Sequence, residues 1–128
     1  MKFRTTVSFL ALSALASIAM AGEIKPFSQA EFDQLTKAGQ PVVVDVSATW
    51  CPTCKAQKPI LEKLMQQPAY KGVTLLTVDF DAEKSTVRAF KVSMQSTLVG
   101  FHGTKEVARS VGDTTEAGIE GLVQKTLR

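Results

Sequence analysis

The stretch VVVDVSATWCPTCK, residues 42–55, contains both cysteines of the chain and the pattern that decides its fold. Val42 to Val46 form an apolar, β-branched run with a single acid, Asp45, inside it. Such a run has the length and composition of a strand that is buried on both faces of a sheet. A helical pattern follows Cys54, so the cysteine pair is expected where a strand ends and a helix begins.

Patterns on either side of this stretch predict alternating helices and strands. Ser28 and Glu31 have the spacing of a capping box at the start of one helix, and Asp113 and Glu116 have it at the start of the last. A further short strand near Ile24 is compatible with the pattern. The predicted elements are helices over 27–41, 55–67, 82–90 and 113–127, and strands over 41–48, 73–80, 97–101 and 106–112.

This order predicts a βαβ unit followed by a hairpin and a helix, which is an α/β fold with a mixed sheet covered on both faces. The cysteines would lie at the carboxyl edge of that sheet, where ligands and chemistry tend to gather. Pro59 falls inside the helix that follows them and should kink it.

The first 21 residues have the pattern of a cleaved secretory signal. Lys2 and Arg4 form a basic start, an apolar run covers 7–20, and Ala19-Met20-Ala21 fits a cleavage site. The alternative is a membrane anchor, but the run is shorter than the roughly 20 apolar residues that span a bilayer. We therefore expect a signal peptide over 1–21, a single domain over 22–128 and a periplasmic location.

Composition excludes some classes of partner. Removing Lys2 and Arg4 from the 15 basic residues leaves 13 against 12 acidic ones, a net charge near +1. No basic patch with interleaved aromatic residues is present, so we expect no nucleic-acid partner. A monomer is expected.

The residues around the cysteines resemble the thioredoxin family over essentially the whole of 22–128. The resemblance rests on the Trp50-Cys-Pro-Thr-Cys motif, on Asp45 nine positions before Cys54, on Pro59 as a helix-kinking proline, and on Gly112. It implies the thioredoxin fold, with a central mixed β-sheet flanked by helices on both faces. In that fold Asp45 is a buried acid, and Pro59 and Gly112 are structural residues.

Two cysteines with unequal roles follow from this placement. Cys51 should lie half exposed at the helix N-terminus, where unpaired N–H groups and the helix dipole favour a thiolate and make it the attacking nucleophile. Cys54 should be buried and should resolve the mixed disulfide. Asp45, buried without a partner, should have a raised pKa and take the proton from Cys54.

The remaining motif residues are expected around the pair rather than in the chemistry. Trp50 should pack over the site and shield it, with substrate contact as a secondary possibility, and Pro52 and Thr53 are the other neighbours of the site. Thr53 carries no charge, so it should stabilise a thiolate less than a histidine would.

The chain departs from the family pattern at two positions. Ser96 stands where the family carries a cis-proline, in the loop of Gln95, Ser96 and Thr97 that would bind substrate, and Thr77 stands where a lysine often faces the acid. A cis bond before a non-proline residue costs about 2.5–4 kcal/mol, so we predict a trans Gln95–Ser96 bond and a reshaped loop.

The CPTC motif resembles that of periplasmic reductases used in cytochrome c maturation. It implies a periplasmic thiol–disulfide oxidoreductase that acts mainly as a reductase, with the Cys51–Cys54 pair as its redox centre and no further cofactor. Its electrons would come from a membrane protein of the DsbD-like type, because the periplasm is kept oxidising.

Three alternatives stay open. The pair could work as a disulfide-forming oxidase, it could bind or deliver a metal with Ser96 nearby, or the domain could be a binding module without turnover. With one histidine, His102, and two cysteines, a closed zinc site lacks ligands within one chain, so no metal is expected.

Overall fold

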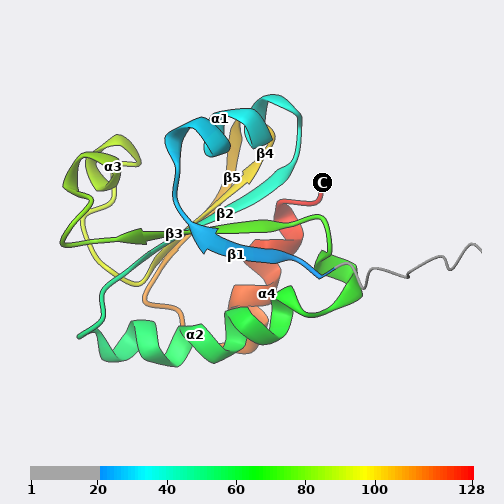
Figure 1. Cartoon of the computed structure of the whole chain (residues 1–128). Helices are drawn as coiled ribbons and strands as arrows, with labels where there is room; N and C mark the ends of the chain where they lie inside the picture. The colour runs from blue at the N-terminus through cyan, green and yellow to red at the C-terminus, as the bar shows by residue number, and fades with distance from the viewer. Residues whose placement is uncertain (1–20) are drawn as a thin grey trace, which may run out of the picture.

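The apolar run before the cysteines forms the central strand of a five-stranded sheet (Figure 1). The structure is a computed structural model, and it describes residues 21–128. The strand order is β1-β3-β2-β4-β5, with β1, β3 and β2 parallel and β4 and β5 antiparallel to their neighbours. The strands are β1 (Glu23–Pro26), β2 (Pro41–Ser47), β3 (Thr74–Asp79), β4 (Thr97–His102) and β5 (Lys105–Val111).

Within residues 21–128, four helices cover the two faces of the sheet. α2 and α4 lie on one face and α1 and α3 on the other, which confirms the predicted thioredoxin fold (Figure 1). The helices are α1 (Gln29–Lys37), α2 (Pro52–Met65), α3 (Lys84–Ala89) and α4 (Glu116–Lys125), with a short 3-10 turn, η1, over Pro68–Tyr70.

Each face of β2 contributes to a separate hydrophobic layer. Val43 packs with leucines of α2 and α4, whereas Val42, Val44 and Val46 pack with the aromatic side chains on the α1 and α3 side. Because side chains alternate across a strand, Asp45 shares the face of Val43. The carboxyl group is therefore directed toward the α2 side of the sheet.

The helix starts agree with the sequence in one case and differ in the other. Ser28 caps α1 and accepts a hydrogen bond from the Glu31 N–H, as predicted. The cap of α4 is Thr115 rather than Asp113, so that prediction was wrong. Asp113 instead accepts hydrogen bonds from the N–H and hydroxyl of Thr115, the local turn that aspartate side chains favour.

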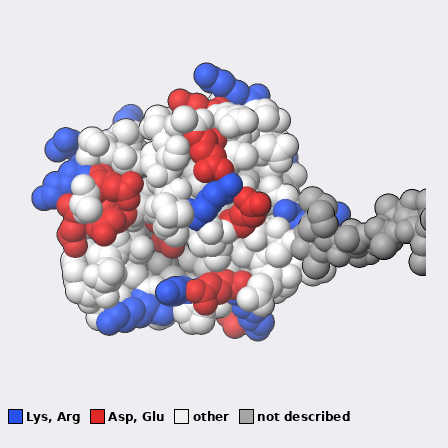
Figure 2. Space-filling model, in the orientation of Figure 1, with Lys and Arg blue, Asp and Glu red and all other residues white. Residues whose placement is uncertain are grey.

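The predicted signal peptide lies almost entirely outside the described residues, so it stays a prediction, as does the boundary at 22. Within residues 21–128, no helix is both long enough and apolar enough to cross a bilayer. The face of the domain drawn in Figure 2 carries acidic and basic side chains in small groups next to one another.

Candidate functional site

The two cysteines lie at the N-terminus of α2 and form a disulfide. Cys51 is the N-cap residue, and its sulfur accepts a hydrogen bond of 3.2 Å from the Cys54 N–H. Pro52 occupies the first helical position. An N–H group at this position has no partner within the helix, so the missing N–H of proline costs no hydrogen bond. The sulfur of Cys51 therefore lies at the positive end of the helix dipole.

Cys51 is more deeply buried than expected. Its exposed fraction is 1%, against 7% for Cys54, so the prediction of a half-exposed Cys51 was wrong for this disulfide-bonded form. The reason is the loop before β4, whose Ser96 side chain lies against the sulfurs. Sequence patterns could not place this loop, because its path depends on tertiary contacts.

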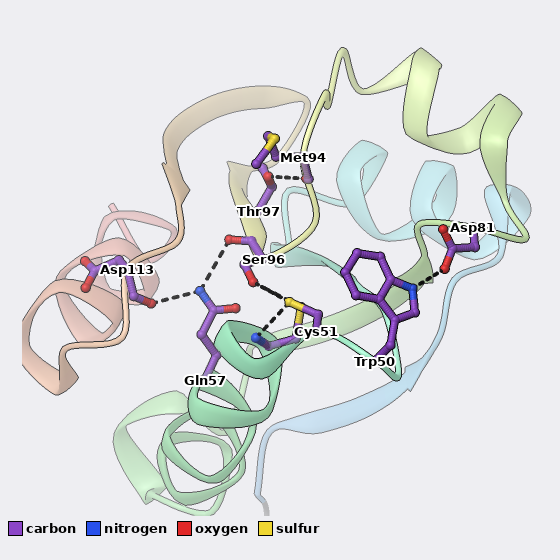
Figure 3. The surroundings of a disulfide bond; sticks show 9 residues. Trp50, Cys51, Gln57, Asp81, Met94, Ser96, Thr97 and Asp113 are labelled. Atoms are coloured by element: carbon purple, nitrogen blue, oxygen red, sulfur yellow. Dashed lines mark hydrogen bonds between the residues drawn. A yellow bond between two sulfur atoms is a disulfide. The ribbon is translucent and has the colours of Figure 1, made fainter.

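Ser96 contacts both sulfur atoms (Figure 3). Its Oγ lies 3.1 Å from Cys51 Sγ and 3.0 Å from Cys54 Sγ, and the residue is 3% exposed. None of the peptide bonds in the described part of the chain is cis, which agrees with the predicted trans Gln95–Ser96 bond. Ser96 has a φ of 60°, a left-handed conformation that is unfavourable for a residue with a side chain.

Gln57 is a site residue that was not predicted from the sequence. Its side chain is 1% exposed, and its Nε2 donates to the Ser96 carbonyl at 3.3 Å and to the Asp113 carbonyl at 2.8 Å (Figure 3). Gln57 shares the buried face of α2 with Cys54 and Leu61, so a polar residue in that apolar stripe was the available signal. The amide ties the loop to the helix that carries the cysteines.

Asp45 lies in a cavity of about 390 Å³ that also reaches Cys54. One carboxyl oxygen, Oδ1, is buried without a hydrogen-bond partner. Burial raises the pKa of Asp45 from 3.8 to about 6, in the predicted direction and for the predicted reason. A carboxyl group with this pKa can exchange a proton near neutral pH.

Thr77 is the register partner of Asp45 on β3. Its hydroxyl donates to the carbonyl of Lys25 at 3.4 Å, so it gives the carboxyl group no hydrogen bond. Lys55 and Lys58 of α2 line the same cavity, but neither forms an ion pair with Asp45. The acid therefore has no cationic partner among the described residues.

Trp50 lies at the rim of the site rather than over it. Its side chain is 55% exposed, and its indole N–H donates to Asp81 at 2.7 Å (Figure 3). Trp50 is therefore not a buried packing residue, and its side chain is accessible at the edge of the site. Met94 and Val111 are among the other exposed apolar residues, at 53% and 58%.

The remaining predicted residues occupy supporting positions. Thr53 lies in the first turn of α2, and Pro59 lies inside the same helix, which continues through it to Met65. Thr97 begins β4, and its hydroxyl donates to the Met94 carbonyl at 2.7 Å. Gly112 has a φ of 71° and donates its N–H to the Ser96 carbonyl at 2.9 Å.

The metal-binding alternative receives no support from side-chain positions. Across residues 21–128, no three His, Cys, Asp or Glu side chains lie together in a group that could hold an ion. His102 is exposed, and its Nδ1 lies 2.8 Å from the carbonyl oxygen of Thr126. Both residues are distant from the cysteines in the sequence.

Comparison with known proteins gives the same assignment as the site. The thioredoxin family model matches residues 23–125. Thioredoxin from Chlamydia muridarum is 40% identical over 84 residues, which cover 66% of this chain and 80% of the relative. Thioredoxin-2 from Saccharomyces cerevisiae is 37% identical over 86 residues, covering 66% and 81%.

Solved structures agree. The crystal structure of Trxlp from Edwardsiella tarda superposes with a TM-score of 0.75 and 41% identity, covering 77% of this chain and 97% of that one. Mitochondrial thioredoxin 3 from Saccharomyces cerevisiae, in its oxidised form, superposes with a TM-score of 0.68 and 28% identity, covering 79% and 92%. The chain therefore belongs to the thioredoxin family, and its Cys51–Cys54 pair is that of a thiol–disulfide oxidoreductase.

Proposed function

We propose that this chain is a periplasmic reductase of protein disulfides that works through the Cys51–Cys54 dithiol. The observation that carries the proposal is the setting of the pair. Cys51 caps α2, and Cys54 reaches a cavity that contains the unpartnered carboxyl group of Asp45. One sulfur is thus placed to be a thiolate, and the other is placed beside a proton acceptor.

The first step uses the reduced protein. The helix N-terminus favours the thiolate of Cys51, which attacks one sulfur of the substrate disulfide. The substrate S–S bond breaks, its second sulfur leaves as a thiolate that is protonated by solvent, and a mixed disulfide with Cys51 forms.

The second step releases the substrate. Cys54 loses its thiol proton to Asp45 and attacks Cys51 Sγ, so the mixed disulfide breaks. The substrate sulfur that Cys51 had attacked leaves as a thiolate and takes a proton from solvent. Two electrons have then passed to the substrate, and the protein holds the Cys51–Cys54 disulfide seen here. Asp45 suits this role because, with a pKa of about 6, its carboxyl group is ionised in most protein molecules at neutral pH.

A protein substrate is favoured by the surface around the pair. Trp50, Met94 and Val111 are exposed apolar residues, and Val111 pairs with Thr97 at the end of the loop that covers the sulfurs. An extended peptide could place apolar side chains on this rim and pair with backbone groups of Gln95 and its neighbours, as an added strand does.

Electrons must be resupplied after each turnover. We propose that a membrane protein of the DsbD-like type reduces the disulfide and that the chain works as a monomer. The support is the apolar run over 7–20, which would direct the chain to the periplasm, where no reducing buffer is present.

The test is the reduction of insulin by the purified protein with dithiothreitol as electron donor. We expect turnover by the wild type and none above the uncatalysed rate for Cys51→Ser. Cys54→Ser should accumulate a mixed disulfide with insulin. Wild-type turnover equal to that of Cys51→Ser would contradict the reductase proposal.

Location is tested separately, by fractionating cells that express the full chain with a C-terminal tag. Release of a shortened chain by osmotic shock is expected. A full-length chain that stays with the cytosol or the membrane would contradict the periplasmic part of the proposal.

A further inference from the structure

Ser96 supplies a hydroxyl group where the family pattern has a proline ring. Its Oγ lies between the two sulfurs, at 3.1 Å from Cys51 Sγ and 3.0 Å from Cys54 Sγ. A serine hydroxyl has one proton to donate, so it can donate to only one sulfur at a time. In the disulfide both sulfurs are weak acceptors, and neither contact is strong.

Reduction changes the strength of this contact. The Cys51 thiolate carries a full negative charge, and hydrogen bonds to charged acceptors are about twice as strong as neutral ones. Among the described residues, the hydrogen-bonding partners of Cys51 Sγ are the Cys54 N–H and the Ser96 hydroxyl. The hydroxyl is therefore the side-chain donor available to the thiolate.

The hydroxyl is held in place by contacts to the backbone of its own residue. The Ser96 carbonyl accepts from the Gly112 N–H at 2.9 Å and from Gln57 Nε2 at 3.3 Å. These bonds hold a left-handed backbone conformation that is unfavourable for a residue with a side chain. A strained residue that is fixed by buried partners at a reactive centre suggests a functional role.

We propose that the Ser96 hydroxyl donates a hydrogen bond to the Cys51 thiolate in the reduced protein, and that Gln57 is a positioning residue that holds Ser96 in place for this bond. Ser96 is then a catalytic residue, because it touches the reacting sulfur. The proposal rests on the thiol–disulfide chemistry of the pair and applies to both directions of electron flow.

The hydrogen bond favours the reduced protein over the disulfide. It makes the Cys51 thiol more acidic, and it makes the disulfide easier to reduce, because a stabilised thiolate product shifts the equilibrium toward reduction. The ionisable residues that line the cavity with Cys54 are Asp45, Lys55, Lys58 and Glu62, and Asp81 accepts a hydrogen bond from the Trp50 indole. None of these residues forms a hydrogen bond with Cys51 Sγ in the described part of the chain.

The experiment measures the acidity of Cys51 directly. The reduced protein is alkylated with iodoacetamide over a range of pH, and peptide mapping identifies the modified cysteine. Ser96→Ala should lower the acid dissociation constant of the Cys51 thiol about tenfold, because the thiolate loses a charge-assisted hydrogen bond; a tenfold change corresponds to about 1.36 kcal/mol. The dithiol–disulfide equilibrium with glutathione should move about tenfold toward the disulfide, which equals about 30 mV.

Two further variants separate the hydroxyl from the fold. Ser96→Gly also removes the hydroxyl but tolerates the positive φ, so it should be more stable than Ser96→Ala and show the same loss of acidity. Ser110→Ala is the matched control, because the Ser110 hydroxyl is buried on β5 without a partner. It should leave the acidity of Cys51 unchanged.

Gln57 is tested by a double-variant cycle. Gln57→Leu should lower the acidity of Cys51, and adding it to Ser96→Ala should have no further effect, because Gln57 acts through the Ser96 hydroxyl. A purely structural role for Gln57 would give additive effects and would overturn its assignment as a positioning residue.

The hydroxyl proposal is overturned if Ser96→Ala and Ser96→Gly both keep the acidity of Cys51 within about twofold of wild type. It is also overturned if Ser110→Ala changes that acidity as much as Ser96→Ala does. Alkylation needs no protein substrate, so a failure of insulin reduction alongside a clear Ser96 effect would overturn the reductase proposal and leave this one standing.

Discussion

Replacing Asp45 by asparagine should stabilise the protein at neutral pH and slow its chemistry. Burial raises the pKa of Asp45 from 3.8 to about 6. At pH values between these two, the folded protein holds a proton that the unfolded chain has released, so stability falls as the pH rises through this window. The gap is roughly two pH units, and each unit corresponds to about 1.36 kcal/mol.

The ionised carboxyl group therefore lowers the free energy of unfolding by about 3 kcal/mol above pH 6, and by nothing well below pH 4. Asparagine has the same shape and no charge, although its amide still loses some hydration in the cavity. We expect Asp45→Asn to be more stable than wild type by about 1–3 kcal/mol at pH 8 and to differ much less near pH 4.

Urea unfolding of the two oxidised proteins at both pH values measures this difference. Comparing the change between pH 4 and pH 8 removes the contributions of other titrating groups, which both proteins share. Glu62→Gln is the control, because Glu62 is an exposed α2 residue that lines the same cavity and forms only a surface pair with Lys58. Equal pH dependence in wild type and Asp45→Asn would refute the conclusion that burial raises the pKa of Asp45.

Three further predictions concern other parts of the site. With the reduced protein near neutral pH, iodoacetamide should label Cys51 far faster than Cys54, and equal rates in mass spectrometry would contradict their unequal roles. Ser96→Pro should change the relative rates on a panel of disulfide peptides while keeping the pair oxidisable, and an unchanged profile would show that the loop does not select substrate. Gly112→Ala should lower the free energy of unfolding by about 1–2 kcal/mol, because residue 112 has a positive φ. Gly121→Ala should raise it by up to about 1 kcal/mol, because residue 121 lies in α4 with open space around the added methyl group. Urea titrations that give both changes the same sign would refute this reasoning.

The alternation of apolar runs and amphipathic patterns was enough to predict the fold. The run over 42–46 has the length and composition of a strand covered on both faces, and the acid within it predicted the raised pKa of Asp45. These features follow from the local pattern of apolar and polar residues, and this pattern can be read from the sequence.

The details around the sulfurs could not be predicted in the same way. The burial of Cys51 and the contacts of the Ser96 hydroxyl depend on a loop whose path is fixed by a left-handed residue and by the Gln57 amide. The N-cap residue of α4 is Thr115 and not the expected Asp113, because the Asp113 side chain accepts a hydrogen bond from the Thr115 N–H in a local turn. Each of these outcomes is decided by tertiary contacts or by competition between nearby hydrogen bonds.

The reduction potential of the Cys51–Cys54 pair tests the central claim most directly. It is measured by equilibrating the protein with glutathione buffers of known ratio and quantifying the dithiol and disulfide forms. A reductase with a thiolate stabilised by a helix N-terminus and a neutral hydroxyl should lie between roughly −270 mV, as in thioredoxin, and roughly −180 mV. A value near roughly −120 mV, as in a strong disulfide-forming oxidant, would contradict the assignment of this protein as a reductase.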